Sequence, residues 1–109
     1  MATEAAKLGG WSTVKPVTKE VKEICIKEKP EIEKKTATNF KDYIPLLYRS
    51  QVVNGTNYLV KVDVCQENGT LEDKCVHAII HQALPCNGGE LTVTGVQYPK
   101  TIIDPLVPF

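Results

Sequence analysis

The sequence predicts an α+β fold in which one long amphipathic helix packs on a four- to five-stranded antiparallel sheet. Apolar residues recur at helical spacing in the first third of the chain, and they alternate with polar residues at a period of two from residue 41 onward. The alternating segments are separated by short connections that contain Asn, Gly and Pro, which favours antiparallel hairpins. The apolar stripe of the helix must then be buried against one face of the sheet.

Residues 1–10 are expected to form a flexible arm, followed by a single domain that comprises residues 11–109. The arm is small and polar apart from Leu8, and it ends in Gly9-Gly10. Such a segment has little means of forming a helix or of joining a core.

One amphipathic helix is predicted after the arm. Ser12 or Thr13 offers a capping side chain, and Pro16 suits a first helical turn. Pro30 lies inside the helical pattern, where it lacks a backbone donor and crowds the preceding turn, so we expect a kink or local break there. The apolar positions of the stripe are Val17, Val21, Ile24, Cys25 and Ile32.

Four strands are predicted after the helix, over residues 43–53, 58–64, 75–84 and 91–98. The clearest alternation places Tyr58, Val60, Val62 and Val64 on one face of a half-buried strand. The connections contain Asn54-Gly55, Asn68-Gly69 and the segment from Pro85 to Gly89. In a meander of this order the first and third turns emerge at the same end of the sheet, which the arm is also able to reach.

Length, composition and charge exclude several functions. The 109 residues, of which 42% are hydrophobic, suffice for one domain with a modest core and leave no room for a second, catalytic domain. Lys and Arg together number 13, as do Asp and Glu, so the net charge is zero. Because no overall field would attract nucleic acid or an anionic membrane, we expect neither as a partner.

The compartment is predicted from the first residues and from the cysteines. No segment approaches the roughly 18 uninterrupted apolar residues of a membrane-spanning helix. Residues 1–10 contain Glu4 and Lys7 in place of an apolar secretory core. We therefore expect a cytoplasmic protein with reduced thiols. A disulfide between Cys65 and Cys75 is geometrically feasible across neighbouring strands, but cytosolic redox conditions oppose it.

Two of the turns have residue types suited to rigid, apolar loops. Asn54-Gly55 favours the positive φ angles of a sharp hairpin, and the preceding Val52 and Val53 are β-branched and therefore stiff. Pro85 fixes its own φ and limits Leu84 to extended geometry. Each motif taken alone also fits an ordinary turn.

The order and spacing of these motifs resemble those of the stefins, the type 1 branch of the cystatin superfamily. The resemblance covers nearly the whole chain and includes Gly55-Thr56-Asn57-Tyr58 and Lys29-Pro30. It implies a cystatin-like fold and a reversible, competitive, non-covalent inhibitor of papain-like cysteine proteases such as papain and cathepsin-like enzymes. The inhibitor would enter the active-site cleft as a wedge, and it would need no cofactor, metal or catalytic residue.

The stefin resemblance also implies which residues would contact the protease. Gly9 would let the arm approach closely while Leu8 fills an apolar subsite on the non-primed side, and the two hairpins would occupy the primed side. The predicted contact residues are Leu8, Gly9, Gly10, Gln51, Val52, Val53, Asn54, Gly55, Leu84, Pro85 and Cys86.

The chain departs from the stefin pattern at two positions. Trp11 is larger than the residue usual there, and Cys86 would be an exposed thiol whose oxidation or alkylation weakens binding, unless it is an inert surface cysteine. The second hairpin lacks the Pro-Trp pair of secreted cystatins, and the cysteines do not follow the disulfide spacing of that branch. Both facts favour the stefin branch.

Enzymatic and metal-binding alternatives centre on one strand. A thiol–imidazole pair would need Cys75 with His77 or His81. We expect these side chains on the solvent side of the sheet without an enclosing pocket, because Val76, Ala78 and Ile80 should face the helix, so the protein is predicted not to be an enzyme. Zinc ligation by Cys75, His77, His81 and Cys86 is disfavoured because the two histidines would lie roughly 13 Å apart along the strand.

Two further alternatives concern binding and assembly. A non-inhibitory binding module that keeps the cystatin fold is conceivable given Trp11 and Cys86, but the intact glycines and hairpin residues argue against it. The chain is expected to be mainly a monomer. Exchange of the helix and first strands between two chains, which would open the loop from Val52 to Gly55, is the alternative and would abolish inhibition.

Overall fold

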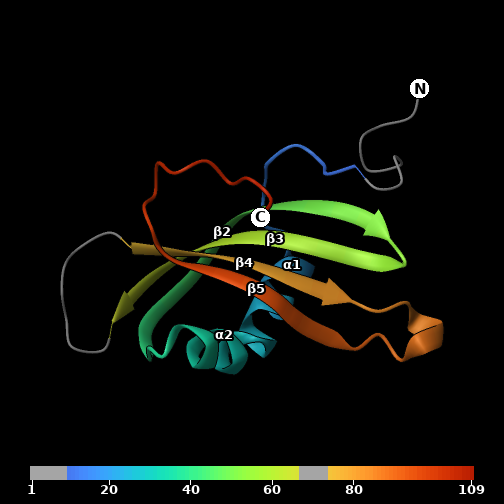
Figure 1. Ribbon diagram of the computed structural model, residues 1–109, viewed down its shortest axis with the longest axis horizontal. Coiled ribbons are helices and arrows are strands. Elements are labelled where there is room, and N and C mark those ends of the chain that lie inside the picture. The colour runs from blue at the N-terminus through green and yellow to red at the C-terminus, as the bar shows by residue number, and fades with distance from the viewer. Residues whose placement is uncertain (1–9, 67–73) are drawn as a thin grey trace.

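A computed structural model describes residues 10–66 and 74–109 of the chain, with five strands and two α-helices (Figure 1). The five strands form one antiparallel sheet in the order β1-β2-β3-β4-β5. The α+β prediction is thereby confirmed. The elements are β1 (Lys15–Pro16), α1 (Lys19–Lys27), α2 (Lys29–Thr36), β2 (Phe40–Val53), β3 (Gly55–Gln66), β4 (Lys74–Gln82), the short 3-10 helix η2 (Pro85–Asn87) and β5 (Leu91–Lys100).

The start of the helix differs from the prediction. Thr18 is the N-cap of α1, and its hydroxyl accepts a hydrogen bond from the backbone N–H of Val21 at 3.2 Å. Pro16 lies in β1, opposite Leu47 of β2, so the assignment of Ser12 or Thr13 as the cap and of Pro16 to a helical turn is wrong. The fixed φ of proline suits an edge strand as well as a first helical turn, and here pairing with β2 decides between them.

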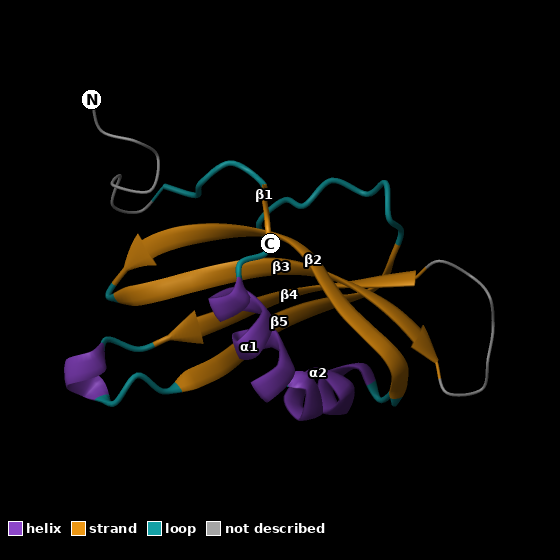
Figure 2. Cartoon of the chain, turned by 180° about the vertical axis from the view of Figure 1, so that it is seen from behind, coloured by secondary structure: helices purple, strands orange, loops and turns teal. Residues whose placement is uncertain are grey.

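The single long helix predicted from the sequence consists of two consecutive helices. The break falls at Glu28, which ends α1 and precedes Pro30 in the first turn of α2. A proline ring clashes with the carbonyl four residues earlier, so the chain leaves regular helical geometry just before Pro30, as predicted. The break lets both helices follow the twisted sheet (Figure 2).

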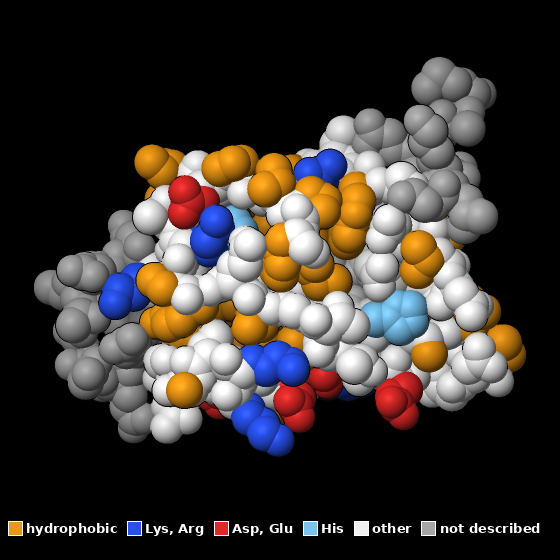
Figure 3. Space-filling model, viewed as in Figure 1, with side chains coloured by type: hydrophobic (Ala, Val, Ile, Leu, Met, Phe, Trp, Pro, Cys, Tyr) orange, Lys and Arg blue, Asp and Glu red, His pale blue; other side chains and the backbone are white. Residues whose placement is uncertain are grey.

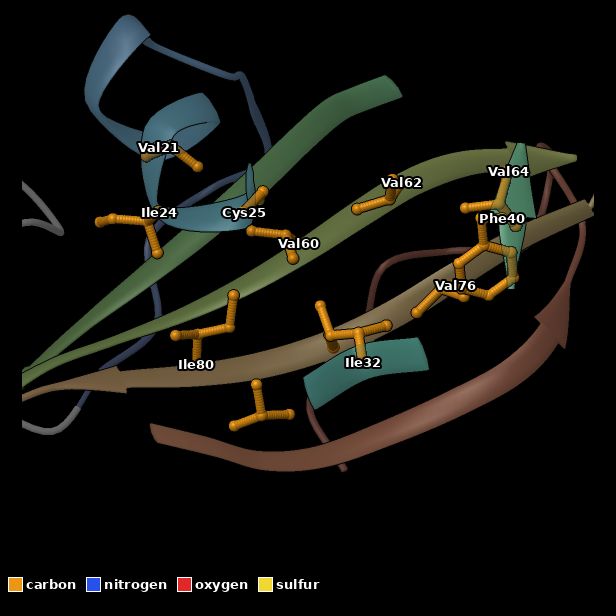
Figure 4. Packing of buried hydrophobic residues seen from close by; sticks show 12 residues of the cluster. Val21, Ile24, Cys25, Ile32, Phe40, Val60, Val62, Val64, Val76 and Ile80 are labelled. Carbon is orange, nitrogen blue, oxygen red and sulfur yellow. The ribbon is translucent and has the colours of Figure 1, made fainter. Parts of the chain in front are cut away.

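The main core lies between the helices and one face of the sheet, as the alternation predicts. Figure 4 shows the side chains of both helices pointing toward those of β3 and β4. Ile32 of α2 and Val60 of β3 are both fully buried in this cluster. The cluster also contains Val21, Ile24, Cys25, Phe40, Val62, Val64, Val76, Ala78, Ile80 and Val93. In the described part of the chain, neither helix has the length and apolarity that crossing a membrane requires.

The opposite face of the sheet is covered as well, contrary to the prediction. The segment after β5 crosses this face (Figures 1 and 2). Within it, Leu106 packs against Leu59 and Ile79. Lys61 of β3, which is 3% exposed, donates hydrogen bonds to the backbone carbonyls of Ile102, at 2.9 Å, and Asp104. Figure 3 shows hydrophobic side chains gathered over this part of the molecule.

This cover buries two side chains that were expected to face solvent. Cys75 and His77 are each 0% exposed, and His81 is half-buried, so the prediction of an open face for β4 is wrong. The strand alternation itself is correct, because Val76, Ala78 and Ile80 do belong to the core under the helices. The C-terminal segment lacks a periodic pattern, which is why its position on the sheet was not predicted.

Candidate functional site

The first hairpin is a very tight turn between β2 and β3. Val53 pairs with Gly55, so that Asn54 alone forms the tip. Gly55 has φ of +105°, and a Cβ placed on it would lie 2.3 Å from the backbone oxygen of Gln82. Glycine is therefore required both by the conformation and by the close approach of β4. Val52 and Asn54 are exposed and Gln51 and Val53 are half-buried.

The second loop connects β4 to β5 and is held by its own backbone. The carbonyl of Leu84 accepts hydrogen bonds from the N–H groups of Asn87, at 2.8 Å, and Gly89, at 3.0 Å. Leu84 is in extended geometry, as expected before a proline, and 36% of it is exposed. Pro85 and Cys86 are exposed beside it. The loop thus presents an apolar projection on a fixed turn.

The two loops meet at one end of the sheet, as the predicted meander requires (Figure 1). Thr56, just after the first hairpin, pairs with Gln82, just before the second loop. An open depression of about 350 Å³ lies between them. Its lining residues are Gly55, Thr56, Gln82, Ala83, Leu84, Pro85, Gly88 and Gly89.

The base of the N-terminal arm is fixed beside the first hairpin. Trp11 forms an isolated β-bridge with Gln51, and the N–H of Ser12 donates to the carbonyl of Ser50 at 2.7 Å. Trp11 also packs against the cluster formed by Leu59, Ile79 and Leu106. The departure from the stefin pattern at this position is therefore an anchor. Gly10 precedes it and is half-buried. The predicted contact residues Leu8 and Gly9 lie outside the described residues.

Arg49 of β2 links the segment before β1 to the segment after β5 by hydrogen bonds. Its guanidinium donates to the carbonyl of Ser12 at 2.8 Å and to that of Leu106 at 3.0 Å. The sequence analysis did not predict these contacts of Arg49 with Ser12 and Leu106. Because these contacts use backbone oxygens, which every residue has, no residue pattern marks them.

A hydrogen-bonded row of three side chains lies beneath the first hairpin and was also missed. The side-chain nitrogen of Asn57 donates a hydrogen bond to Oε1 of Gln51 at 2.9 Å. The side-chain oxygen of Asn57, Oδ1, lies 2.8 Å from Nδ1 of His81. With the Asn57 amide in this orientation, His81 is the donor. Gln51, Asn57 and His81 are directly opposite one another on β2, β3 and β4. We define these three residues as the hairpin row.

The two loops contain no charged side chain. Residues 51–56 and 82–89 include no Lys, Arg, Asp, Glu or His. Burying these surfaces against a partner would therefore not require desolvating a charged group. Among the residues that the structure describes, no group of three or more His, Cys, Asp or Glu is arranged to hold a metal ion. The surface is suited to shape recognition of another protein.

The fold and this arrangement of loops define a cystatin. The family model for the cystatin domain matches residues 9–99, and the chain belongs to the cystatin family, in its stefin branch.

Three similar proteins match this chain over nearly its full length. The chain is 38% identical to leukocyte cysteine proteinase inhibitor 1 of Sus scrofa, over 100% of both chains. It is 37% identical to cystatin-A of Homo sapiens, over 93% of this chain and 97% of that protein. It is 33% identical to cystatin-B of Oplegnathus fasciatus, over 93% and 95% respectively. The family confirms the prediction that the chain is not an enzyme.

Proposed function

We propose that this protein is a reversible, competitive, non-covalent inhibitor of papain-like cysteine proteases. The observation that carries the proposal is the meeting of both loops and the base of the arm at one uncharged end of the sheet. The relative from Sus scrofa that is named a cysteine proteinase inhibitor matches over its full length, which supports the same activity here.

The mechanism is occlusion of the active-site cleft by a wedge. The first hairpin, from Gln51 to Gly55, and the second loop, from Leu84 to Cys86, enter the primed side of the cleft. The arm, residues 8–10, lies along the non-primed side. No peptide bond of the inhibitor is presented to the catalytic thiol in a reactive orientation, so the inhibitor is not cleaved and forms no covalent bond with the thiol.

Rigidity of the loops favours tight binding. An interface of standard size, about 1,600 Å², supports nanomolar affinity when its parts are preformed. Gly55 is packed against β4, and Leu84 accepts two backbone hydrogen bonds within its own loop. These two parts of the wedge lose little conformational freedom on binding. Ordering the arm costs about 1–2 kcal/mol for each residue fixed, which discounts its contribution.

We further propose that the inhibitor acts in the cytoplasm as a monomer. Among the described cysteines, Cys25 and Cys86 are not in disulfides, which suits a reducing compartment. Fractionation of cells that produce the tagged protein tests the location. Size-exclusion chromatography of active and inactive fractions tests the assembly, and an inactive dimer fraction would support domain exchange through the first hairpin.

The decisive experiment is steady-state inhibition of papain, in the presence of reductant, by the full chain and by a version that begins at Trp11. Competitive inhibition at nanomolar concentration, weakened by the truncation, is expected. Mass spectrometry after long incubation should recover the intact inhibitor. If the full chain fails to inhibit at micromolar concentration, the wedge proposal is wrong and the fold serves another protein partner.

A further inference from the structure

From the hairpin row we infer that His81 is a positioning residue for the first hairpin. This inference rests on the proposed inhibitory function and deepens it. His81 does not belong to the surface that would enter the cleft. It acts through Asn57 and Gln51, the two residues that it joins to β4.

The row links the ends of three strands close to the tip of the first hairpin (Figure 1). Gln51 lies on β2 and Asn57 on β3, so their hydrogen bond of 2.9 Å fixes the separation of the two strands of the hairpin. The hydrogen bond between Asn57 and His81, 2.8 Å long, fastens the same hairpin to β4. Without that bond the hairpin would be joined to β4 by the backbone pairing of β3 with β4 and by the packing of Gly55 against Gln82, with no side-chain hydrogen bond between Asn57 and β4.

The position of His81 in the chain extends this link to the second loop. The next residue, Gln82, presents the carbonyl oxygen against which Gly55 packs, and Leu84 follows two positions later. The imidazole itself lies beneath Gly55, since a Cβ on Gly55 would be 3.0 Å from its Cε1 and 3.1 Å from its Nε2. One side chain therefore contacts the first hairpin while its neighbours begin the second loop.

The row also reaches the base of the arm. Gln51 pairs with Trp11, which is anchored on the cluster of Leu59, Ile79 and Leu106. The hydrogen bonds from His81 to Asn57 and from Asn57 to Gln51 thus connect the parts of all three elements of the wedge that the structure describes. Their function is to hold the first hairpin in register with the other two elements before the protease arrives.

Substitution of His81 tests this role through the hydrogen bond rather than through packing. His81→Leu keeps much of the side-chain volume but removes the donor to Asn57. His81→Asn places an amide nitrogen where Nδ1 lies and so retains that donor. Thr92→Val is the matched control, because Thr92 is exposed, lies opposite His81 on β5 and is not part of the hairpin row.

Two measurements are made on the wild type and the three variants. The first is the inhibition constant for papain at 25 °C, and the second is the set of backbone 15N order parameters for residues 53–56 in the free protein. His81→Leu should raise the inhibition constant about threefold to tenfold, the range that one net hydrogen bond supplies. It should also lower the order parameters of the hairpin. His81→Asn and Thr92→Val should match the wild type in both, with thermal unfolding confirming that every variant is folded at 25 °C.

The outcomes separate this inference from the proposed function. If the wild type fails to inhibit papain, the proposed function is wrong, and the order parameters still decide whether His81 positions the hairpin. The inference is overturned if His81→Leu leaves hairpin order unchanged. It is also overturned if His81→Asn is as impaired as His81→Leu, because ring packing rather than the hydrogen bond would then be responsible.

Discussion

Lys61 and His77 face each other directly across β3 and β4, and both are buried beneath the C-terminal segment. The ammonium group of Lys61 is satisfied by the carbonyls of Ile102 and Asp104. Neither ring nitrogen of His77 has a hydrogen-bond partner among the described residues. Burial, together with the positive charges of Lys61 and Lys100, lowers the pKa of His77 to about 4.

A pH-dependent loss of stability follows from this lowered pKa. The imidazole is neutral in the folded protein and titrates near pH 6.5 once the chain unfolds. Its contribution to stability is complete above pH 6.5 and is lost as the pH falls toward 4, because the unfolded chain then binds the additional proton. The total loss is about 3 kcal/mol, at 1.36 kcal/mol for each pKa unit.

The variant His77→Leu isolates this effect. It should unfold in urea with less dependence on pH between 4 and 6.5 than the wild type, and be at least as stable at pH 7, because a buried, unpaired imidazole is removed. Subtracting the two pH profiles cancels the contributions of the carboxylates. Parallel profiles for the two proteins would contradict the account of His77.

Gly55 and Gly88 provide a matched pair of glycines with positive φ. An alanine at either position would have a strained backbone conformation. Of the two, only at Gly55 would the added Cβ collide with backbone, 2.3 Å from the carbonyl oxygen of Gln82. Gly55→Ala should destabilise the protein by about 3 kcal/mol and raise the inhibition constant for papain more than about tenfold. Gly88→Ala, which meets nothing within 4 Å, should cost about 1 kcal/mol. Urea unfolding and steady-state inhibition measure both, and equal effects would show that the contact with β4 is unimportant.

Trp11 should contribute to stability as well as to binding. Its ring packs on Leu59, Ile79 and Leu106, so Trp11→Ala should lower the free energy of unfolding by about 2 kcal/mol, less than the loss for a fully buried tryptophan. Release of the arm's base should also weaken inhibition of papain. Trp11→Leu, which keeps an apolar anchor, should lose less on both counts. If Trp11→Ala unfolds like the wild type, the ring is not an anchor.

Alkylation should distinguish Cys86 from the buried cysteines. Cys86 is exposed at the second loop, whereas Cys25 and Cys75 are buried, and burial raises the pKa of Cys25 to about 12. Brief treatment of the native protein with iodoacetamide should modify Cys86 and weaken inhibition of papain by steric interference at the loop. Inhibition by the Cys86→Ser variant, measured before and after the same treatment, should not change. Full activity of protein alkylated at Cys86 would place this residue outside the interface.

The elements that the sequence predicted correctly are those with local causes. The stripe through Val21 and Ile32 and the alternation through Val60 are repeated patterns that one segment displays by itself. The first hairpin and the second loop were found because Asn54-Gly55 and Leu84-Pro85 restrict their own backbone. That these residues contact a protease, together with Leu8 and Gly9, remains a prediction.

The elements that were missed depend on contacts between distant segments. Pro16 fits a helix or an edge strand equally well, and only its pairing with β2 decides. The C-terminal segment binds Lys61 through backbone carbonyls, which leave no trace in the residue types. The hairpin row needs the register of β4 against β3, which places His81 opposite Asn57, and the residue pattern leaves that register undetermined.

The two-residue strand β1 bears on how the protein behaves at high concentration. Open sheet edges recruit further chains, and short, proline-bearing edge strands are a recognised defence against such growth. Here the segment leading through Pro16 occupies the outer side of β2, where Ser12 and Val17 donate to the carbonyls of Ser50 and Leu46. At the far edge, β5 ends in Pro99-Lys100. A sheet whose two edges are protected in this way should keep the protein in solution at concentrations where an open meander of the same strands would grow into fibrils.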